Sequence, residues 1–240
     1  MSVSGPIVGF DTATPRLSVA ATGGDGLLFE RAIDPGAGER PAHTRELLGA
    51  VESAAAAAGG WGAVEAIAAG IGPGSFTGLR IGVATARGLA QGLEKPIAAV
   101  GSLRALARGI AAGLDDPDGS WLAVIDARRG QVFAALYVGA GAELWEPFVA
   151  SPSELAARVG GLDSQPVAGG DGSLRFRHQL ESAGARVLAD DDEGHRISAR
   201  HICDLARDAG VSRPEEVEPI YLRPPDAELW REQHRRDGKH

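Results

Sequence analysis

Apolar and polar positions follow a pattern that occurs twice, about half a chain apart. Residues 6–33 predict three β-strands: one that ends at Asp11, an alternating strand after a Thr/Pro turn, and a third after a Gly-rich turn. Residues 121–149 show the same order, with Asp126 at the position of Asp11. Each of these segments is expected to form a three-stranded meander.

Helical and strand patterns alternate after each predicted meander. Apolar residues recur with the period of an α-helix in segments that short apolar strands separate. The predicted helices lie near residues 43–58, 76–92, 103–112, 174–183 and 198–208, and a further helix opens at the capping sequence Ser151-Pro152-Ser153-Glu154. The order βββαβαβα thus occurs twice, which predicts an α/β fold of two lobes, each a mixed sheet flanked by helices.

The join between the two copies falls in a polar stretch at residues 115–119, which contains a proline and a turn glycine. We therefore expect an N-terminal lobe over residues 1–114 and a C-terminal lobe over residues 119–225. Residues 226–240 contain few apolar side chains, so this tail is expected to be disordered.

Composition narrows the classes of protein to which the chain can belong. A formal net charge of -8 argues against binding of nucleic acid by bulk electrostatics, so a role in RNA chemistry would run through a partner. The single cysteine, Cys203, excludes an internal disulfide and is expected to be buried on a helix. With no apolar run of about 20 residues and no secretory signal, we expect a cytoplasmic protein without a membrane segment.

A glycine-rich loop joins an apolar strand to an amphipathic helix that begins near Ser75 or Thr77. Gly72, Gly74 and Gly78 would let a phosphate approach the free N–H groups of the helix start. The same glycines would equally serve a tight strand-to-helix turn and close packing. Both interpretations remain open from the residues alone.

Three sharper interpretations of this loop can be compared with the residues around it. A Walker A loop needs Lys after its last glycine, but Leu79 and Arg80 follow Gly78. A serine nucleophile elbow needs glycine two residues before the serine, where Pro73 precedes Ser75. A dinucleotide-binding loop, as in an NADP-dependent oxidoreductase, fits the strand-loop-helix context but lacks the usual acidic residue after the next strand.

The loop also carries a specific resemblance. The segment GPGSFTGLRIG, residues 72–82, is similar almost letter for letter to the signature of the TsaB/YeaZ family. Further matches are FDTATPRLSVA at the N-terminus, HTRELL at 43–48, DARRG at 126–130 and PIYLRP near the C-terminus. Together these matches span residues 7–225.

The resemblance implies an actin-like ATPase (ASKHA) fold of two RNase H-like lobes, in agreement with the repeat. In that superfamily nucleotide phosphates often lie between the lobes, near the first hairpin turn of each. The candidate nucleotide- or anion-binding residues are accordingly Asp11, Thr12, Gly72, Gly74, Ser75, Thr77, Gly78, Asp126 and Arg128. Asp11 can also be read as a turn residue that accepts backbone hydrogen bonds.

The related transferase TsaD carries a His-x-x-x-His metal pair after the shared glycine motif, whereas this sequence has Ser102 and Leu106 at the matching positions. No catalytic residue and no metal site are therefore expected. The resemblance implies a non-catalytic scaffold or activating subunit for the transfer of threonylcarbamoyl to N6 of the adenosine beside the anticodon, in tRNAs that read ANN codons. The implied partners are a TsaD-like paralogue and a TsaE-like ATPase. ATP, Mg²⁺ and tRNA would belong to the assembled complex, and self-pairing as a homodimer stays open.

The helices near 43–58 and 76–92 are the expected contact surface for that partner, because their small residues permit close approach of another helix. The candidate interface residues are Leu47, Val51, Ala55, Arg80, Val83 and Arg87. Bases outnumber acids between Arg80 and Arg108, which predicts either a tRNA contact in the complex or a solvated helix face. The alternative functions are a small-molecule kinase of the same superfamily and, with less support, a peptidase.

Overall fold

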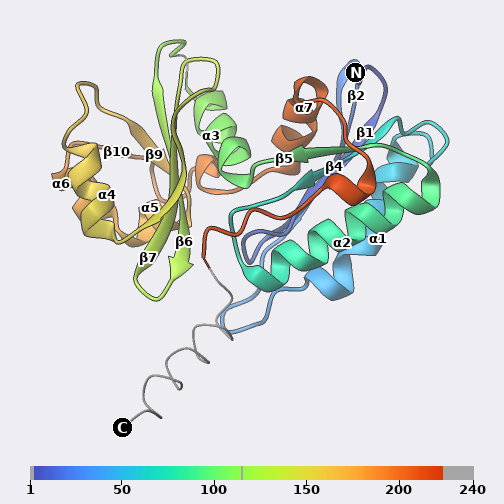
Figure 1. The fold of residues 1–240 in the computed structure, drawn as a ribbon, viewed down its shortest axis with the longest axis horizontal. Helices are drawn as coiled ribbons and strands as arrows, with labels where there is room; N and C mark the ends of the chain where they lie inside the picture. The colour runs from blue at the N-terminus through green and yellow to red at the C-terminus, as the bar shows by residue number, and fades with distance from the viewer. Residues whose placement is uncertain (1–2, 115, 224–240) are drawn as a thin grey trace, which may run out of the picture.

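Two five-stranded sheets form the framework of the molecule (Figure 1). The structure is a computed structural model and describes residues 3–114 and 116–223. The strands are β1 (Ile7–Asp11), β2 (Leu17–Gly23), β3 (Gly26–Ile33), β4 (Ala66–Gly70), β5 (Ile97–Val100), β6 (Ser120–Arg128), β7 (Gln131–Val138), β8 (Ala142–Ala150), β9 (Val167–Gly169) and β10 (Arg186–Val187). Their order is β3-β2-β1-β4-β5 in the first sheet and β10-β9-β6-β7-β8 in the second. Each meander is antiparallel and the later strands of each sheet pair in parallel, so the predicted pair of mixed sheets is confirmed.

Most of the predicted helices are present within a residue or two of their expected ends. They are α1 (His43–Ala57), α2 (Phe76–Leu93), α3 (Ser102–Ala112), α4 (Pro152–Val159), α5 (Asp171–Arg175), α6 (Arg177–Ser182) and α7 (Ala199–Ala209), with short 3₁₀ turns η1 (Glu193–His195) and η2 (Pro214–Glu216). The cap predicted for α4 is confirmed, because Oγ of Ser151 accepts the N–H of Glu154 at 3.3 Å while Glu154 Oε2 accepts the N–H of Ser151 at 2.8 Å.

The second copy departs from prediction in one place. The single helix expected near 174–183 is broken at Phe176, whose φ of -114° is not helical, so two short helices take its place. The break lets Phe176 pack against the core of the second sheet while Arg175 reaches Asp126 on β6. The strand predicted after it is reduced to the two residues of β10.

Layers of helix cover both faces of the first sheet, which explains why β1 and β4 are buried at every position. Val8 and Phe10 of β1 pack with α1 and α2. Ile7, on the opposite face, packs with α7, where a Cβ on Gly9 would lie 2.5 Å from the Sγ of Cys203. Cys203 is buried on this helix as predicted, and burial raises the pKa of its thiol to about 12.

Two helices are exchanged between the halves of the chain. α3 belongs to the first half of the sequence but packs on β6 and β9 of the second sheet, whereas α7 follows the second sheet but packs on β1 and β2 of the first. Figure 1 shows α3 and α7 together between the two sheets, and they contact each other. The chain thus crosses between the sheets at residues 100–102 and again at 197–199. We call the first sheet with α1, α2 and α7 the first lobe, and the second sheet with α3 to α6 the second lobe.

The segment after α7 also returns to the first lobe. Ser212 pairs with Ile97 at the edge of β5, and the N–H of Ile220 donates to the carbonyl oxygen of Ile71 at 2.8 Å. The predicted division into residues 1–114 and 119–225 therefore separates the two sheets but not the helices that cover them. The expectation for residues 226–240 lies outside the described residues.

Candidate functional site: the cleft between the lobes

Asp11 ends β1 and is only 1% exposed. Its Oδ2 accepts a hydrogen bond of 2.6 Å from the hydroxyl of Ser102, and its Oδ1 accepts the N–H of Ala13 at 2.8 Å. Burial raises the pKa of the Asp11 carboxyl, and these two hydrogen bonds oppose the rise. Both carboxylate oxygens are engaged inside the protein, so the geometry supports the turn-residue interpretation of Asp11.

The glycines of the loop before α2 are used for close packing. The hydroxyl of Thr12, which is fully buried, donates to the carbonyl oxygen of Gly78 at 2.8 Å. A Cβ at Gly74 would collide with the carbonyl oxygen of Ala13, and a Cβ at Gly78 would collide with that of Thr12. Of the two interpretations that the sequence left open, this contact between α2 and the β1–β2 turn favours packing for Gly74 and Gly78.

Two other candidates of this loop do face open space. Ser75 accepts the N–H of Gly78 at 3.1 Å as the cap of α2, and Ser75 and Thr77 line a cavity between the lobes. The N–H groups of Phe76 and Thr77 belong to the first turn of an 18-residue helix and have no acceptor within that helix.

The second hairpin contributes Asp126 and Arg128. Asp126 Oδ1 accepts the N–H of Arg128 at 2.9 Å, and Asp126 Oδ2 accepts from Nη1 of Arg175 at 2.8 Å. The N–H of Asp126 donates to Oδ1 of Asp171 at 2.9 Å. Asp126 is therefore held by two arginines, while the Arg128 side chain is 66% exposed.

The space between the lobes consists of two adjoining cavities. The larger has a volume of about 290 Å³ and the smaller about 220 Å³, and Thr14, Pro15, Ile125 and Asp171 line both. Asp11 and Thr12 line neither of them. The structure thus brings Gly74, Ser75, Thr77, Asp126 and Arg128 together around the larger cavity and separates them from Asp11, Thr12, Gly72 and Gly78.

Sequence reasoning missed Asp171, the acid that both cavities share. Asp171 follows β9 in a second glycine loop, residues 169–172, which occupies the same position in the second copy as the loop after β4 in the first. Burial raises the pKa of the Asp171 carboxyl, and the backbone N–H of Asp126 opposes the rise. The signal was present, because the sequence AGGDGS follows the matching strand of the repeat.

The predicted partner-interface residues divide into two groups. Leu47, Val51, Ala55 and Val83 are all buried in the core between the first sheet and its helices, so the prediction that they contact a partner is wrong. The apolar faces of these helices pack against the first sheet of the same chain. The sequence pattern predicts that such a face is buried, but it does not show whether the chain's own sheet or a partner protein buries it. Arg80 and Arg87 are exposed on α2.

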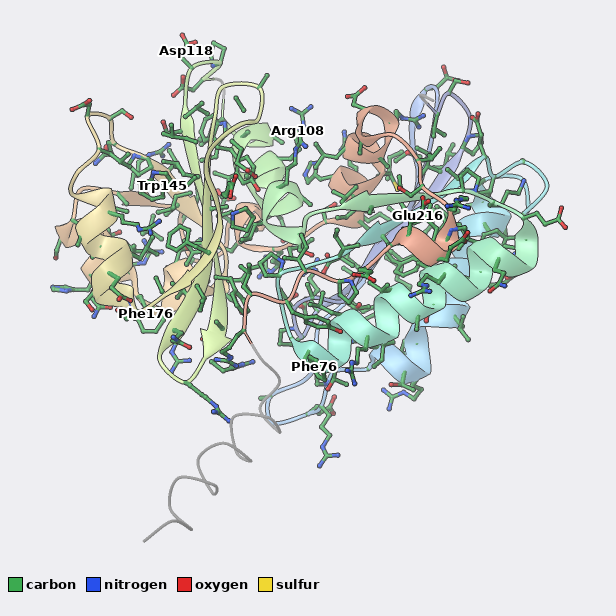
Figure 2. The ribbon with its side chains drawn as sticks, viewed as in Figure 1. Phe76, Arg108, Asp118, Trp145, Phe176 and Glu216 are labelled. Atoms are coloured by element: carbon green, nitrogen blue, oxygen red, sulfur yellow. The ribbon has the colours of Figure 1, made fainter. Side chains whose placement is uncertain are left out.

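The predicted basic strip is divided by the helix exchange. Arg80 and Arg87 lie on α2 of the first lobe, whereas Arg104 and Arg108 lie on α3 of the second. Figure 2 shows Arg108 and Phe76, the first residue of α2, at opposite ends of the space between the lobes. A single continuous basic surface is therefore not formed by these residues.

The positions at which TsaD carries its histidine pair have structural roles here. Ser102 is fully buried and bonded to Asp11, and Leu106 is buried in the core between the lobes. Among residues 3–114 and 116–223, no group of three or more metal-binding side chains could hold a metal ion. Within the same part of the chain, no helix is both long and apolar enough to cross a membrane.

Comparisons with known proteins agree with this architecture. The family model described as "TsaD: tRNA N6-adenosine threonylcarbamoyltransferase" matches residues 38–175. The tRNA threonylcarbamoyladenosine biosynthesis protein TsaB of Escherichia coli (strain K12) is 30% identical over 226 residues, which are 90% of this chain and 94% of that protein.

Two solved structures are also similar to this chain over most of its length. YeaZ from Pseudomonas aeruginosa has a TM-score of 0.74 at 26% identity, covering 91% of this chain and 100% of that chain. The ROK hexokinase of Thermus thermophilus, at 15% identity and a TM-score of 0.50, covers 82% of this chain and 97% of that chain and is similar in fold alone. The match to the E. coli protein extends over nearly all of both chains, so this chain belongs to the TsaB/YeaZ family of tRNA threonylcarbamoyladenosine biosynthesis proteins and has the actin-like ATPase fold.

Proposed function

We propose that this chain is a non-catalytic subunit in tRNA threonylcarbamoyladenosine synthesis, where it docks against a TsaD-like paralogue and supports recruitment of a TsaE-like ATPase. The observation that carries the proposal is the burial of Ser102 and Leu106 at the positions of the metal-binding histidines of TsaD. A hydroxyl committed to Asp11 and a core leucine offer no ligands to a transition metal. Transfer of the threonylcarbamoyl group would therefore be performed by the partner, in the cytoplasm where tRNA is modified.

The outer surface of α1 and α2 is the proposed docking face. The two helices lie side by side over the first sheet (Figure 1). Leu48 of α1 is 61% exposed there, and α2 turns Ala84 and Gly88 outward. An exposed large apolar side chain on α1 and outward small residues on α2 suit a close-packed partner helix, because the small residues let two helices approach. Self-pairing through the same face would compete with the partner.

Reconstitution tests this function. TsaD-like and TsaE-like proteins of the same organism would be incubated with tRNA, ATP, Mg²⁺, bicarbonate, threonine and the enzyme that forms the adenylate. We expect modified adenosine only when this chain is added, and no modified adenosine from this chain without the TsaD-like protein. Full activity in the absence of this chain would reject the proposal.

A second function, phosphoryl transfer to a small molecule, is favoured by the cavities between the lobes and by the fold shared with the hexokinase. The Asp126 carboxylate, which borders this space, is held by Arg128 and Arg175 and is therefore poorly placed to act as a base. Calorimetry with ATP and Mg²⁺ separates the two functions, since tight binding and turnover by the isolated chain would support the kinase.

A further inference from the structure

Aromatic and cationic side chains gather at the start of α2, at the edge of the larger cavity. The guanidinium of Arg80 lies over the ring of Phe76, 3.9 Å from its centroid. The ring of Tyr221 lies 5.1 Å from that of Phe76, centroid to centroid, and Tyr221 is 42% exposed. Phe76 and Tyr221 both line the cavity, and Figure 2 places Phe76 at the lower end of the space between the lobes. A half-buried Phe76 and a partly exposed Tyr221 therefore place two aromatic rings at the edge of the cavity.

The second lobe supplies a cation to the same cavity. Arg128 lines it from the β6–β7 turn, and its contact with Asp126 is long, at 3.5 Å between Nη1 and Oδ2. Arg128 and Arg129 both have left-handed backbone conformations, with φ of 64° and 53°, which non-glycine residues rarely adopt. The N–H of Arg128 bonded to Asp126 holds this turn in place, so the arginine is presented at the cavity by a constrained hairpin.

Hydroxyl and amide donors complete the lining. Ser75 and Thr77 border the cavity at the N-terminus of α2, where first-turn N–H groups carry partial positive charge. The cavity thus combines flat rings for a base with a guanidinium and helix N–H groups for a phosphate. A volume of about 290 Å³ suits one nucleotide and excludes a duplex.

We propose that this cavity binds one unpaired nucleotide of tRNA, with the base stacked beside Tyr221 and Phe76 and the phosphate held by Arg128 and the start of α2. That the ligand is a nucleotide is inferred from the residues that line the cavity. That this nucleotide belongs to tRNA rests on the proposed function. The contact is local, which is compatible with a net charge of -8 on the whole chain.

Binding of a fluorescent anticodon stem-loop RNA to the assembled complex tests the site. Tyr221→Leu keeps an apolar side chain beside Phe76 but removes the ring, and we expect roughly ten-fold weaker RNA binding, with Tyr221→Phe close to the natural protein. Arg128→Ala should weaken binding several-fold and lower the slope of log affinity against log salt by about 1. The control is Arg158→Ala, which removes an arginine away from the cavity. Arg158 lies over the ring of Phe148, 4.1 Å from its centroid, as Arg80 lies over Phe76.

Ultraviolet crosslinking of the same RNA, followed by mass spectrometry, gives a readout independent of affinity. We expect a crosslinked nucleotide at Tyr221 or Phe76, both in the complex and, at higher RNA concentration, in the isolated chain. Unchanged affinity in Tyr221→Leu and Arg128→Ala without a crosslink would overturn the proposal, even with the partner bound and tRNA modified. Competition by AMP or ATP at concentrations equal to that of the RNA would instead assign the cavity to a free nucleotide. A crosslink to the partner protein at this face would assign it to protein docking.

Discussion

Ser102 donates a hydrogen bond of 2.6 Å to Oδ2 of Asp11, although 91 residues separate the two in the chain. The same hydroxyl accepts the N–H of Gly72 at 3.0 Å, and the N–H of Ser102 donates to the carbonyl oxygen of Gly72 at 2.7 Å. Ser102 is also the first residue of α3, the helix that crosses to the second lobe. The end of β1, the glycine loop and the first crossing between the lobes are therefore joined at one buried point.

Replacement of Ser102 by alanine should destabilise the fold. The change leaves the Asp11 carboxylate and the Gly72 N–H buried without this partner, a loss of about 1–3 kcal/mol in the free energy of unfolding. Urea unfolding followed by circular dichroism measures it. Ser173→Ala is the control, because that buried hydroxyl holds no carboxylate: it donates to the Gly170 carbonyl oxygen of its own loop at 2.7 Å and lies 3.4 Å from Nδ1 of His195, so its loss should cost less. Equal losses in the two variants would contradict a joining role for Ser102.

Asp11 should make stability depend on pH. Its folded pKa is raised above the unfolded value near 3.8, so between these two values the native state holds more protons than the unfolded state, and stability falls as pH rises. Asp11→Asn carries no such penalty. We therefore expect the natural protein to gain stability relative to Asp11→Asn as the pH falls from neutrality towards about 4. Unfolding of both proteins over a series of pH values measures the difference in their free energies of unfolding. If the natural protein instead lost stability relative to Asp11→Asn as the pH fell, the pKa of Asp11 would be lowered in the folded state.

Alanine at Gly78 should be far more damaging than alanine at Gly92 of the same helix. A Cβ at Gly78 would collide with the Thr12 carbonyl oxygen, whereas a Cβ at Gly92 meets nothing within 4 Å. We expect Gly78→Ala to lower the free energy of unfolding by about 1–3 kcal/mol and Gly92→Ala to raise it by about 0.5–1 kcal/mol. Thermal unfolding compares them. If Gly78→Ala retained its stability but lost anion binding, the packing role of this glycine would be rejected.

Charge on the outer face of α1 should prevent docking. Leu48→Glu places a carboxylate on the proposed partner face, and we expect at least ten-fold weaker binding of the TsaD-like protein. The free energy of unfolding should change little, because Leu48 is already exposed. Leu144→Glu is the matched control, since Leu144 is 54% exposed on β8 of the second lobe. Surface plasmon resonance with immobilised partner gives both affinities. Loss of binding in Leu144→Glu alone would move the interface to the second lobe.

Prediction from sequence succeeded where the pattern is local. The duplicated meander, α1, α2 and the Ser151 cap depend on hydrophobic period and on neighbours within one or two turns. Ser75, Thr77, Asp126 and Arg128 lie around the larger cavity, and their role in binding a nucleotide or anion stays a prediction. Asp171 was missed because its position beside Asp126 depends on the pairing of β9 with β6, two strands far apart in the chain.

The sequence by itself determined that the protein has two similar mixed sheets and that its glycine motif is that of the TsaB/YeaZ family, because periodicity and contiguous motifs lie within short stretches of chain. Only the tertiary structure decided that α3 and α7 are exchanged, that Leu47 and Val83 face the core, and that Gly78 serves packing. These outcomes depend on which distant surfaces meet. Helical period shows that a face will be buried, whereas the neighbour that buries it is selected by packing between segments far apart in the chain.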